Sequence, residues 1–263
     1  MRLRIASAVV LAPIALAAVA AGGWSTVAFV ALAGILAANE WDRLCGGRGL
    51  RGGTGIVLAL VILVSTVLAG FGLYEATLAA GAMGMLALAG LALIQGRAAV
   101  WPATGVLYLA VPTVALIWMR GADTGVEMLI WLLVIVWATD IAAIFAGRSI
   151  GGPKLWPRIS PNKTWAGAIA GLLAAAVVGA ITAALREKAT LAIMIPLSVG
   201  LSAISQLGDL AESAIKRYYG VKDTGTLIPG HGGILDRIDG LLLALPAAAV
   251  IALLNKGSAL IWP

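Results

Sequence analysis

Long runs without a single charged residue constrain this chain more than any other feature. From Ile5 to Asn39 there are 35 consecutive residues with no acidic or basic side chain. A helix that crosses the hydrocarbon core of a bilayer needs about 20 apolar residues, and one helix of these 35 residues would be about 52 Å long. The run is too long for one span, and we expect two membrane helices divided at Gly22-Gly23.

Other charge-free runs predict further spans, namely residues 52–74, 76–96, 98–119, 164–185 and 189–208. Two more apolar runs, residues 128–147 and 234–255, contain acidic residues. Together these runs predict an all-α, polytopic integral membrane protein with about nine transmembrane helices. We expect a single membrane domain over residues 1–263, in which residues 1–130 carry no motif and residues 131–263 carry the catalytic spans and cytoplasmic loops.

The composition excludes a water-soluble globule. Of the 263 residues, 61% are hydrophobic and 11% are charged, whereas soluble domains are about 25% charged. Too little polar material is present to cover a soluble enzyme, and the apolar content also excludes a disordered chain. The single cysteine, Cys45, cannot form a disulfide within the chain, which excludes a disulfide-stabilised secreted domain.

The basic residues predict how the spans are oriented. With the N-terminus inside, 14 of the 18 lysines and arginines fall on the inner side and 4 on the outer side, which satisfies the positive-inside rule. Basic cytoplasmic loops then explain the net charge of +6, and we expect no nucleic-acid partner. An alternative for the first run is a signal peptide, since Arg2 and Arg4 precede it, but the run continues straight into a second span.

Five polar residues mark one face of a predicted helix that continues from the run at 189–208. They are Gln206, Asp209, Glu212, Ser213 and Lys216, spaced i, i+3, i+6, i+7 and i+10, which places them on one helical stripe. An acid inside a span is costly unless it is paired, hydrated or bound to a metal. Two interpretations stay open: a polar seam that joins helices, or a binding site for a cation and phosphates.

Glycines and further acids follow this stripe. His231, the one histidine of the sequence, lies between glycines that would let the backbone approach a ligand closely. Asp236 and Asp239 are spaced i and i+3, so they share one face of the first turn of the last span. Helix capping is the alternative for these acids, but it explains two acids beside Arg237 less well than one.

A second polar segment precedes the run at 164–185. It has the glycines and basic residues of a flexible phosphate-binding loop, but not the Gly-Lys-Ser/Thr ending of a P-loop: Gly147, Arg148, Gly151, Gly152 and Lys154. Residues 160–164, Ser-Pro-Asn-Lys-Thr, either contact phosphates or simply cap the following helix.

Carboxylates and basic side chains therefore gather on the predicted cytoplasmic side. Mg²⁺ usually reaches phosphates through one or two carboxylates and several waters, and lysine or arginine neutralises the remaining phosphate charge. The residues by themselves predict metal-dependent phosphate chemistry on a lipid at the inner leaflet.

Residues 213–239 resemble the signature of the phosphatidate cytidylyltransferases, also called CDP-diacylglycerol synthases. The matching positions are Ser213, Lys216, Arg217, Lys222, Asp223, His231, Gly232, Gly233, Asp236, Arg237 and Asp239. Two upstream elements, residues 206–213 and 160–165, also resemble that family, as does the helical membrane architecture over essentially the whole chain.

The resemblance implies a reaction of phospholipid biosynthesis, in which CTP and phosphatidate give CDP-diacylglycerol and pyrophosphate. It also implies Mg²⁺ as the cofactor, with a second cation left open. The implied assembly is a homodimer embedded in the lipid bilayer of a bacterial inner membrane, with its active site facing the cytoplasm.

The resemblance also implies roles for single residues. Asp209 and Asp236 would bind the metal and take part in catalysis. The other implied catalytic positions are Lys216, Arg217, Lys222, His231 and Asp239. The positions implied to bind substrate are Ser160, Asn162, Lys163, Asp140, Asp223, Arg237, Glu212 and Ser213.

Other functions compete with this one. A CTP-dependent polyprenol or phytol kinase shares related motifs but would release CDP instead of pyrophosphate. A transporter would also carry intramembrane acids, but the intramembrane acids here cluster at the inner face. Only the span with Asp140 carries a mid-membrane charge, so a path across the membrane is missing. A CDP-alcohol phosphotransferase would need an Asp-Gly-x₂-Ala-Arg run, which the sequence lacks.

Overall fold

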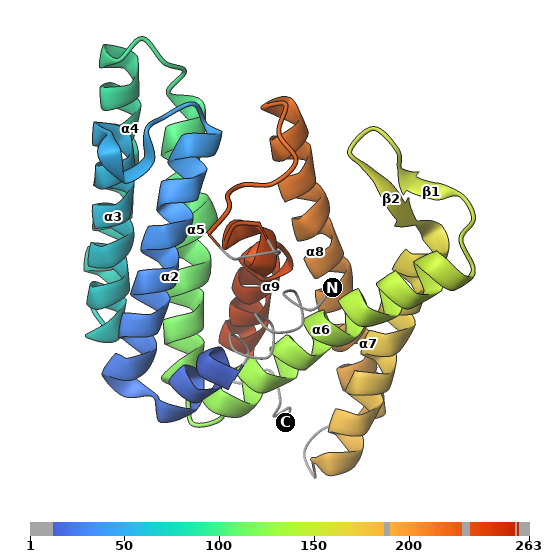
Figure 1. Ribbon diagram of the computed structural model, residues 1–263. Coiled ribbons are helices and arrows are strands. Elements are labelled where there is room, and N and C mark those ends of the chain that lie inside the picture. The colour runs from blue at the N-terminus through green and yellow to red at the C-terminus, as the bar shows by residue number, and fades with distance from the viewer. Residues whose placement is uncertain (1–12, 187–189, 228–231, 256, 258–263) are drawn as a thin grey trace. The chain divides into compact units, whose positions relative to one another are not determined.

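A computed structural model describes residues 13–186, 190–227, 232–255 and 257 (Figure 1). Within them, eight helices are long and apolar enough to cross a membrane: α2 (Gly23–Leu44), α3 (Gly53–Gly70), α4 (Tyr74–Ile94), α5 (Val100–Arg120), α6 (Gly125–Ser149), α7 (Trp165–Leu185), α8 (Leu191–Tyr218) and α9 (Leu235–Leu254). The structure confirms the predicted helical membrane fold and eight of the nine predicted spans. In the remaining predicted span, residues 13–21 are helical and residues 5–12 lie outside the described part.

Exposed apolar side chains show that these helices need a bilayer. On α4, Leu78, Leu86 and Ile94 are each at least 75% exposed. A large apolar surface of this kind is unfavourable in water, whereas the lipid chains of a membrane solvate it without cost. The apolar faces therefore agree with the composition.

The chain forms two compact units that are interleaved in sequence. Unit 1 contains residues 1–121 and 219–238, and unit 2 contains residues 122–218 and 239–263. Unit 1 thus combines the N-terminal helices with a segment that lies far along the chain, and this segment includes most of the signature recognised in the sequence.

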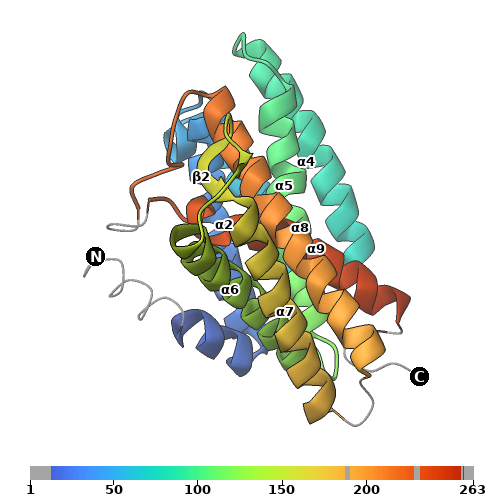
Figure 2. The same ribbon diagram turned by 90° about the vertical axis from the view of Figure 1, so that its right-hand side faces the viewer.

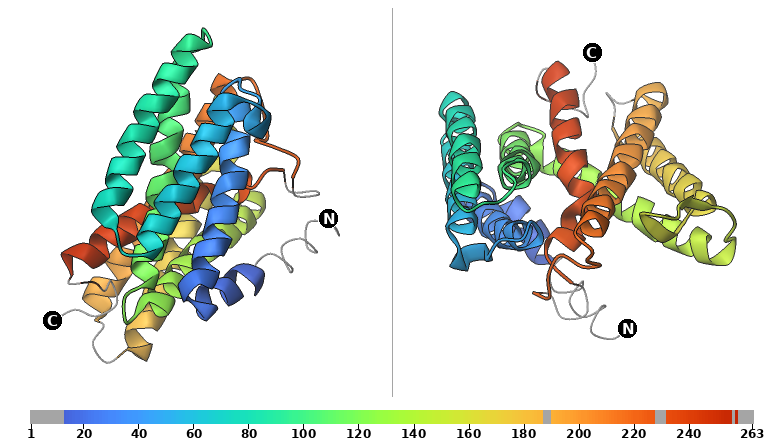
Figure 3. Two further views of the ribbon diagram at one scale, coloured as in Figure 1. Left: turned by 90° about the vertical axis from the view of Figure 1, so that its left-hand side faces the viewer. Right: turned by 90° about the horizontal axis from the view of Figure 1, so that it is seen from above.

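In unit 1, helices α2 to α5 pack side by side (Figure 3). Small residues allow the close approach, since a side chain at Gly105 would collide with the Trp41 indole. That indole donates a hydrogen bond from Nε1 to the carbonyl oxygen of Trp101 at 2.9 Å. A short 3₁₀ helix, η1 (Gly49–Arg51), connects α2 to α3, and Asp42 holds it by accepting a hydrogen bond from the Gly49 amide at 2.9 Å.

In unit 2, helices α6, α7 and α8 lie against one another (Figure 2). A small antiparallel hairpin joins α6 to α7 and is formed by β1 (Lys154–Trp156) and β2 (Ser160–Thr164). It is a minor addition to the helical fold that the sequence predicts. Thr164 caps α7, because its Oγ1 accepts a hydrogen bond from the Gly167 amide at 3.1 Å, so the capping interpretation of residues 160–164 is confirmed at Thr164.

Helix α8 extends beyond the thickness of a membrane. Its 28 residues span about 42 Å, whereas the hydrocarbon core of a bilayer is about 30 Å thick. With the orientation predicted from the basic residues, its last turns project on the inner side. We therefore expect the end of the polar stripe, Lys216, and the following Arg217 to lie outside the hydrocarbon.

Helices α8 and α9 meet at small residues of unit 2. A Cβ atom at Gly208 would lie 2.7 Å from the Asp239 carbonyl oxygen, and one at Gly240 would lie 2.5 Å from Ser205 Oγ. Small residues allow helix backbones to approach closely in membranes. Because Asp209 follows Gly208 and Asp239 precedes Gly240, this crossing brings the two acids into one neighbourhood.

Candidate functional site

The polar stripe predicted from the sequence lies on one continuous helix, α8. Towards the middle of the helix, its side chains join α8 to its neighbours. Ser202 Oγ lies 2.7 Å from Thr139 Oγ1 of α6, and Gln206 Nε2 donates to the Ala168 carbonyl oxygen of α7 at 3.3 Å. The polar-seam interpretation therefore describes this part of the stripe.

Further along α8, the stripe carries charges that form a different kind of group. The Asp209 carboxylate forms an ion pair with the Lys163 ammonium of β2, and Ser213 Oγ donates to Asp209 Oδ1 at 3.5 Å. The Lys163 and Asp209 side chains are 27% and 32% exposed. A solute can therefore reach both charges, which makes this pair the most accessible part of the stripe.

A second ion pair lies one turn later and is closed to solutes. Lys216 Nζ lies 3.4 Å from Glu212 Oε2, and the Glu212 side chain is only 1% exposed. A buried carboxylate requires a charged or hydrogen-bonding partner to offset its lost hydration. Lys216 thus compensates Glu212, and a direct contact between Glu212 and a substrate would require this part of the helix to open.

Four carboxylates gather in this part of unit 2. Asp239 of α9 interacts electrostatically with Asp209, Glu212 and Asp140. Such a concentration of negative charge attracts cations, and Lys163 supplies one of them. Arg217 Nε donates to the Ile159 carbonyl oxygen at 3.3 Å, which ties the end of α8 to the residue before β2.

The other predicted positions of unit 2 lie on the hairpin and on α6. Ser160 and Asn162 belong to β2, where Ser160 is half-buried and Asn162 is exposed. Asp140 is exposed on α6. The structure thus brings β2 and the charged end of α8 together, as the sequence-based hypothesis requires for a shared site.

Asp236, in unit 1, organises the turn that leads into α9. Its Oδ2 accepts hydrogen bonds from the Thr224 amide at 2.9 Å and the Gly233 amide at 2.8 Å, and lies 3.0 Å from Thr224 Oγ1. Asp236 is only 8% exposed. These contacts support the local structural role that the sequence analysis kept as an alternative, and metal binding by Asp236 stays a prediction.

Glu40 of α2 is the residue that the sequence analysis missed. Its Oε1 accepts a hydrogen bond from the Ile234 amide at 2.9 Å, and its Oε2 accepts one from the Leu235 amide at 3.0 Å. Thr224 Oγ1 also lies 3.1 Å from Glu40 Oε2. The available signal was an acid directly after the long charge-free run, next to Trp41, but no pattern linked it to residues so far along the chain.

Four predicted residues of unit 1 remain, and the structure describes three of them. Lys222, Asp223 and Arg237 are exposed, so a solute can reach them. His231 lies outside the described residues.

The donor atoms fit a hard cation that shares its coordination with phosphates. In the part of the chain that the structure describes, no three His, Cys, Asp or Glu side chains converge closely enough to hold a metal ion. Mg²⁺ does not require such a cage, because substrate phosphates and waters complete its shell. Asp209 is the accessible carboxylate of this set. Since Asp209 belongs to unit 2 and Asp236 to unit 1, their binding of one shared ion stays a prediction.

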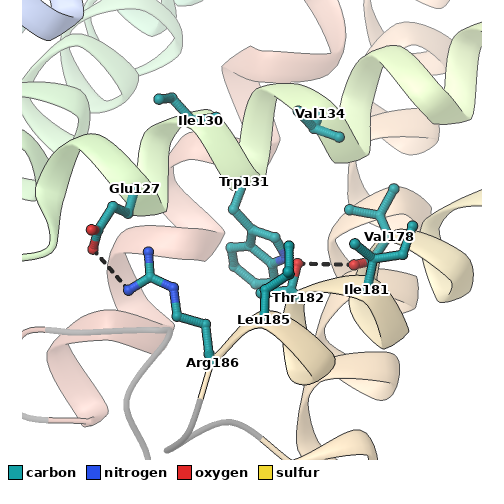
Figure 4. A pocket seen from close by; sticks show the side chains of 9 residues that line it. All are labelled: Glu127, Ile130, Trp131, Val134, Val178, Ile181, Thr182, Leu185 and Arg186. Carbon is teal, nitrogen blue, oxygen red and sulfur yellow. Dashed lines mark hydrogen bonds and ion pairs between the residues drawn. The ribbon is translucent and has the colours of Figure 1, made fainter.

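An apolar groove lies between the first part of α6 and the last part of α7 (Figure 4). These are the ends of the two helices that are not joined by the β1–β2 hairpin. It has a volume of about 300 Å³ and is lined by Ile130, Trp131, Val134, Val178, Ile181 and Leu185, among others. The Glu127 and Arg186 side chains close one end with an ion pair of 3.1 Å. None of the predicted site residues lines this groove.

Comparisons with known proteins point to one family. A model of the cytidylyltransferase family matches residues 2–254. The phosphatidate cytidylyltransferase of Brucella suis biovar 1 (strain 1330) is 51% identical over 146 residues, or 55% of this chain and 54% of that protein. The Bacillus subtilis (strain 168) protein of the same name is 45% identical over 123 residues, 46% of each chain. The chain thus spans about half the length of the curated relatives it matches.

Proposed function

The chain belongs to the cytidylyltransferase family, and from this premise we propose that it is a phosphatidate cytidylyltransferase. The proposed reaction transfers CMP from CTP to phosphatidate and gives CDP-diacylglycerol and pyrophosphate. The observation that carries the proposal is the accessible Lys163–Asp209 ion pair on the charged end of α8, beside further carboxylates. This combination suits a negatively charged nucleotide that arrives with a divalent cation.

In the proposed reaction, a phosphate oxygen of phosphatidate attacks the α-phosphorus of CTP. A new phosphorus–oxygen bond forms, the bond from the α-phosphorus to the oxygen that bridges to the β-phosphorus breaks, and pyrophosphate leaves with that electron pair. No covalent bond to the protein is needed, so the side chains act by positioning groups and by stabilising charge.

The basic side chains would hold the phosphates. Lys163 is partly exposed and already faces a carboxylate, so its ammonium can turn to a phosphate oxygen when a cation takes over Asp209. Arg217 and Lys222 are exposed and can neutralise the charge of the leaving pyrophosphate. Lys216 would act indirectly, because it compensates the buried Glu212.

Asp209 would hold Mg²⁺, and Ser213 would orient its carboxylate through the hydrogen bond to Oδ1. When bound, Mg²⁺ would neutralise phosphate charge and make the α-phosphorus more electrophilic. Asp236 as a further ligand and a second cation are proposed on the resemblance of the 213–239 signature.

We also propose a location and an assembly. The excess of basic residues on the predicted inner side supports a bacterial inner membrane with the site facing the cytoplasm. CTP is a cytoplasmic metabolite and phosphatidate is a membrane lipid, so such a site would reach both substrates. The proposed homodimer rests on the resemblance alone.

One assay tests the proposed reaction. Purified protein in detergent is incubated with CTP labelled in its α-phosphate, phosphatidate and Mg²⁺. We expect the label to enter a lipid-soluble nucleotide while pyrophosphate appears in equal amount. Release of CDP with phosphorylation of an added polyprenol or phytol would instead support the lipid kinase, and equal turnover with ATP would contradict the proposed nucleotide.

A further inference from the structure

Glu40 stands out because it joins the N-terminal helices to the signature segment within unit 1. It lies near the end of α2 and is only 3% exposed. Its two carboxylate oxygens accept hydrogen bonds from consecutive amides, those of Ile234 and Leu235, at 2.9 and 3.0 Å. Figure 3 shows the segment after α8, in orange, beside the end of α2, in blue.

The amides that Glu40 binds have no partner inside their own helix. Leu235 is the first residue of α9 and Ile234 directly precedes it, and the amides at the start of an α-helix lack intrahelical acceptors. A carboxylate at that position satisfies these donors and interacts favourably with the positive end of the helix dipole. Glu40 therefore caps α9 from a different helix.

The glycines of the signature fit around this carboxylate. A Cβ atom at Gly225 would lie 2.8 Å from Glu40 Oε1, and a side chain at Gly233 would collide with both Glu40 and Thr224. Gly232 has a φ of +83°, and a Cβ atom there would lie 2.7 Å from Asp236 Oδ2. The glycines beside His231 were predicted to approach a ligand, but Gly232 and Gly233 approach two of the protein's own carboxylates.

Thr224 couples the two carboxylates. Its Oγ1 lies 3.1 Å from Glu40 Oε2 and 3.0 Å from Asp236 Oδ2, and its amide donates to Asp236 at 2.9 Å. Glu40, Thr224 and Asp236 thus form one buried network, and its displacement would move the segment that carries Lys222 and Asp223.

We propose that Glu40 is a positioning residue for the cytidylyl-transfer site, acting through its hydrogen bonds to Thr224 and to the amides of Ile234 and Leu235. This inference rests on the proposed function and deepens it, because it places an essential group outside the 213–239 signature. Glu40 does not touch substrate. It holds the turn that presents Asp236 and the exposed Lys222 and Asp223.

The first test measures, without any substrate, how strongly Glu40 holds the Ile234 and Leu235 amides. In Glu40→Gln one carboxylate oxygen becomes an NH₂ group, which would face an amide donor. We therefore expect hydrogen exchange of a peptide covering residues 232–237 to become at least tenfold faster. Asp42→Asn is the matched control, since Asp42 is also buried on α2 but binds the Gly49 amide, and exchange of the same peptide should be unchanged.

The second test measures turnover. We expect kcat to fall at least tenfold in Glu40→Gln and to stay within about twofold of wild type in Asp42→Asn, both measured on folded, monodisperse protein. Thr224→Val should also lower kcat, Thr224→Ser should restore it, and the combined Glu40→Gln/Thr224→Val loss should be smaller than the product of the two, because both act on one turn.

The outcomes separate the two proposals. Unchanged exchange in Glu40→Gln, or faster exchange with wild-type kcat, overturns the positioning role. If the wild-type protein transfers no CMP to phosphatidate, the proposed function fails and the positioning role fails with it. The exchange measurement then reports only on the hydrogen bonds between Glu40 and the start of α9. If Glu40→Gln does not fold, Thr224→Val against Thr224→Ser decides the same question, and equal kcat in those two variants overturns the proposal.

Discussion

At the scale of single residues, the surroundings of each carboxylate determine what it can do. Asp42, Glu40 and Asp236 are buried and accept backbone hydrogen bonds, so their oxygens satisfy donors of the fold. Asp209 is partly exposed and faces a lysine on another element. A cation that arrives with the substrate can compete with Lys163 for Asp209. The free energy lost when this partly solvated ion pair breaks is small.

Replacing Asp209 tests this assignment. Asp209→Asn keeps the size of the side chain and removes its charge, which weakens a hard-cation site far more than packing. We expect a loss of nearly all turnover with a melting temperature close to wild type, measured by the CMP-transfer assay and by thermal unfolding in detergent. Asp123→Asn, an exposed acid on the predicted outer side, is the control and should be nearly silent.

More than about a tenth of the wild-type rate in Asp209→Asn, a barrier change below about 1.4 kcal/mol, would show that Asp209 is not a primary ligand. Asp236→Asn is a less direct test, because Asp236 Oδ2 also holds the turn before α9.

The environment of Cys45 predicts an inert thiol. The pKa of the Cys45 thiol is raised to about 12, mainly by burial; a hydrogen bond with Tyr219 lowers it, nearby Asp42 raises it and Arg97 lowers it, each by less than burial raises it. The thiolate is the reactive form, and at pH 8 a pKa of about 12 leaves only about one thiol in ten thousand ionised. We expect no maleimide labelling of the folded protein at pH 8 and complete labelling after denaturation. Fast labelling of the folded protein would show that the site is open.

At the scale of helices, the crossing of α8 and α9 depends on the absence of side chains. A Cβ atom at Gly208 would lie 2.7 Å from the Asp239 carbonyl oxygen, and the backbone cannot move aside easily. Overpacking of this kind typically costs about 1–3 kcal/mol. We expect Gly208→Ala to lower the melting temperature and to reduce turnover, since any shift of the crossing displaces the neighbouring Asp209 and Asp239.

Gly200→Ala is the matched control on the same helix. A Cβ atom at Gly200 would meet no other atom within 4 Å, and alanine favours a helix over glycine by about 1 kcal/mol. We expect unchanged turnover and equal or higher stability. If Gly208→Ala behaves like this control, the close packing at the crossing does not support the site.

At the scale of the whole molecule, the number of crossings makes a testable prediction about sidedness. Three spans, α3, α4 and α5, separate the exposed residues Arg48 and Asp123, so the two must lie on opposite sides of the membrane. Because Cys45 is the single cysteine and is buried, new cysteines can be labelled selectively. We expect a membrane-impermeant maleimide to label Asp123→Cys in right-side-out vesicles and Arg48→Cys only in inverted ones. Labelling of both from one side would contradict the arrangement of these spans.

The sequence by itself determined the membrane fold and the approximate places of eight spans, and it predicted the chemical character of the site. These properties depend on local patterns: charge-free runs long enough to cross a bilayer, a polar stripe on one helix, and a signature of closely spaced residues. It placed Asp209 and Lys163 among the site residues, and the structure pairs them.

Only the tertiary structure decided how the stripe divides and what anchors the signature. Ser202 and Gln206 join helices while Asp209 stays accessible, a difference that depends on which neighbours pack against each turn of α8. The contact of Glu40 with Ile234 and Leu235 bridges 194 and 195 positions along the chain. No local pattern encodes such a pairing, because it arises only when helices far apart in sequence pack together and bury a carboxylate against unsatisfied amides.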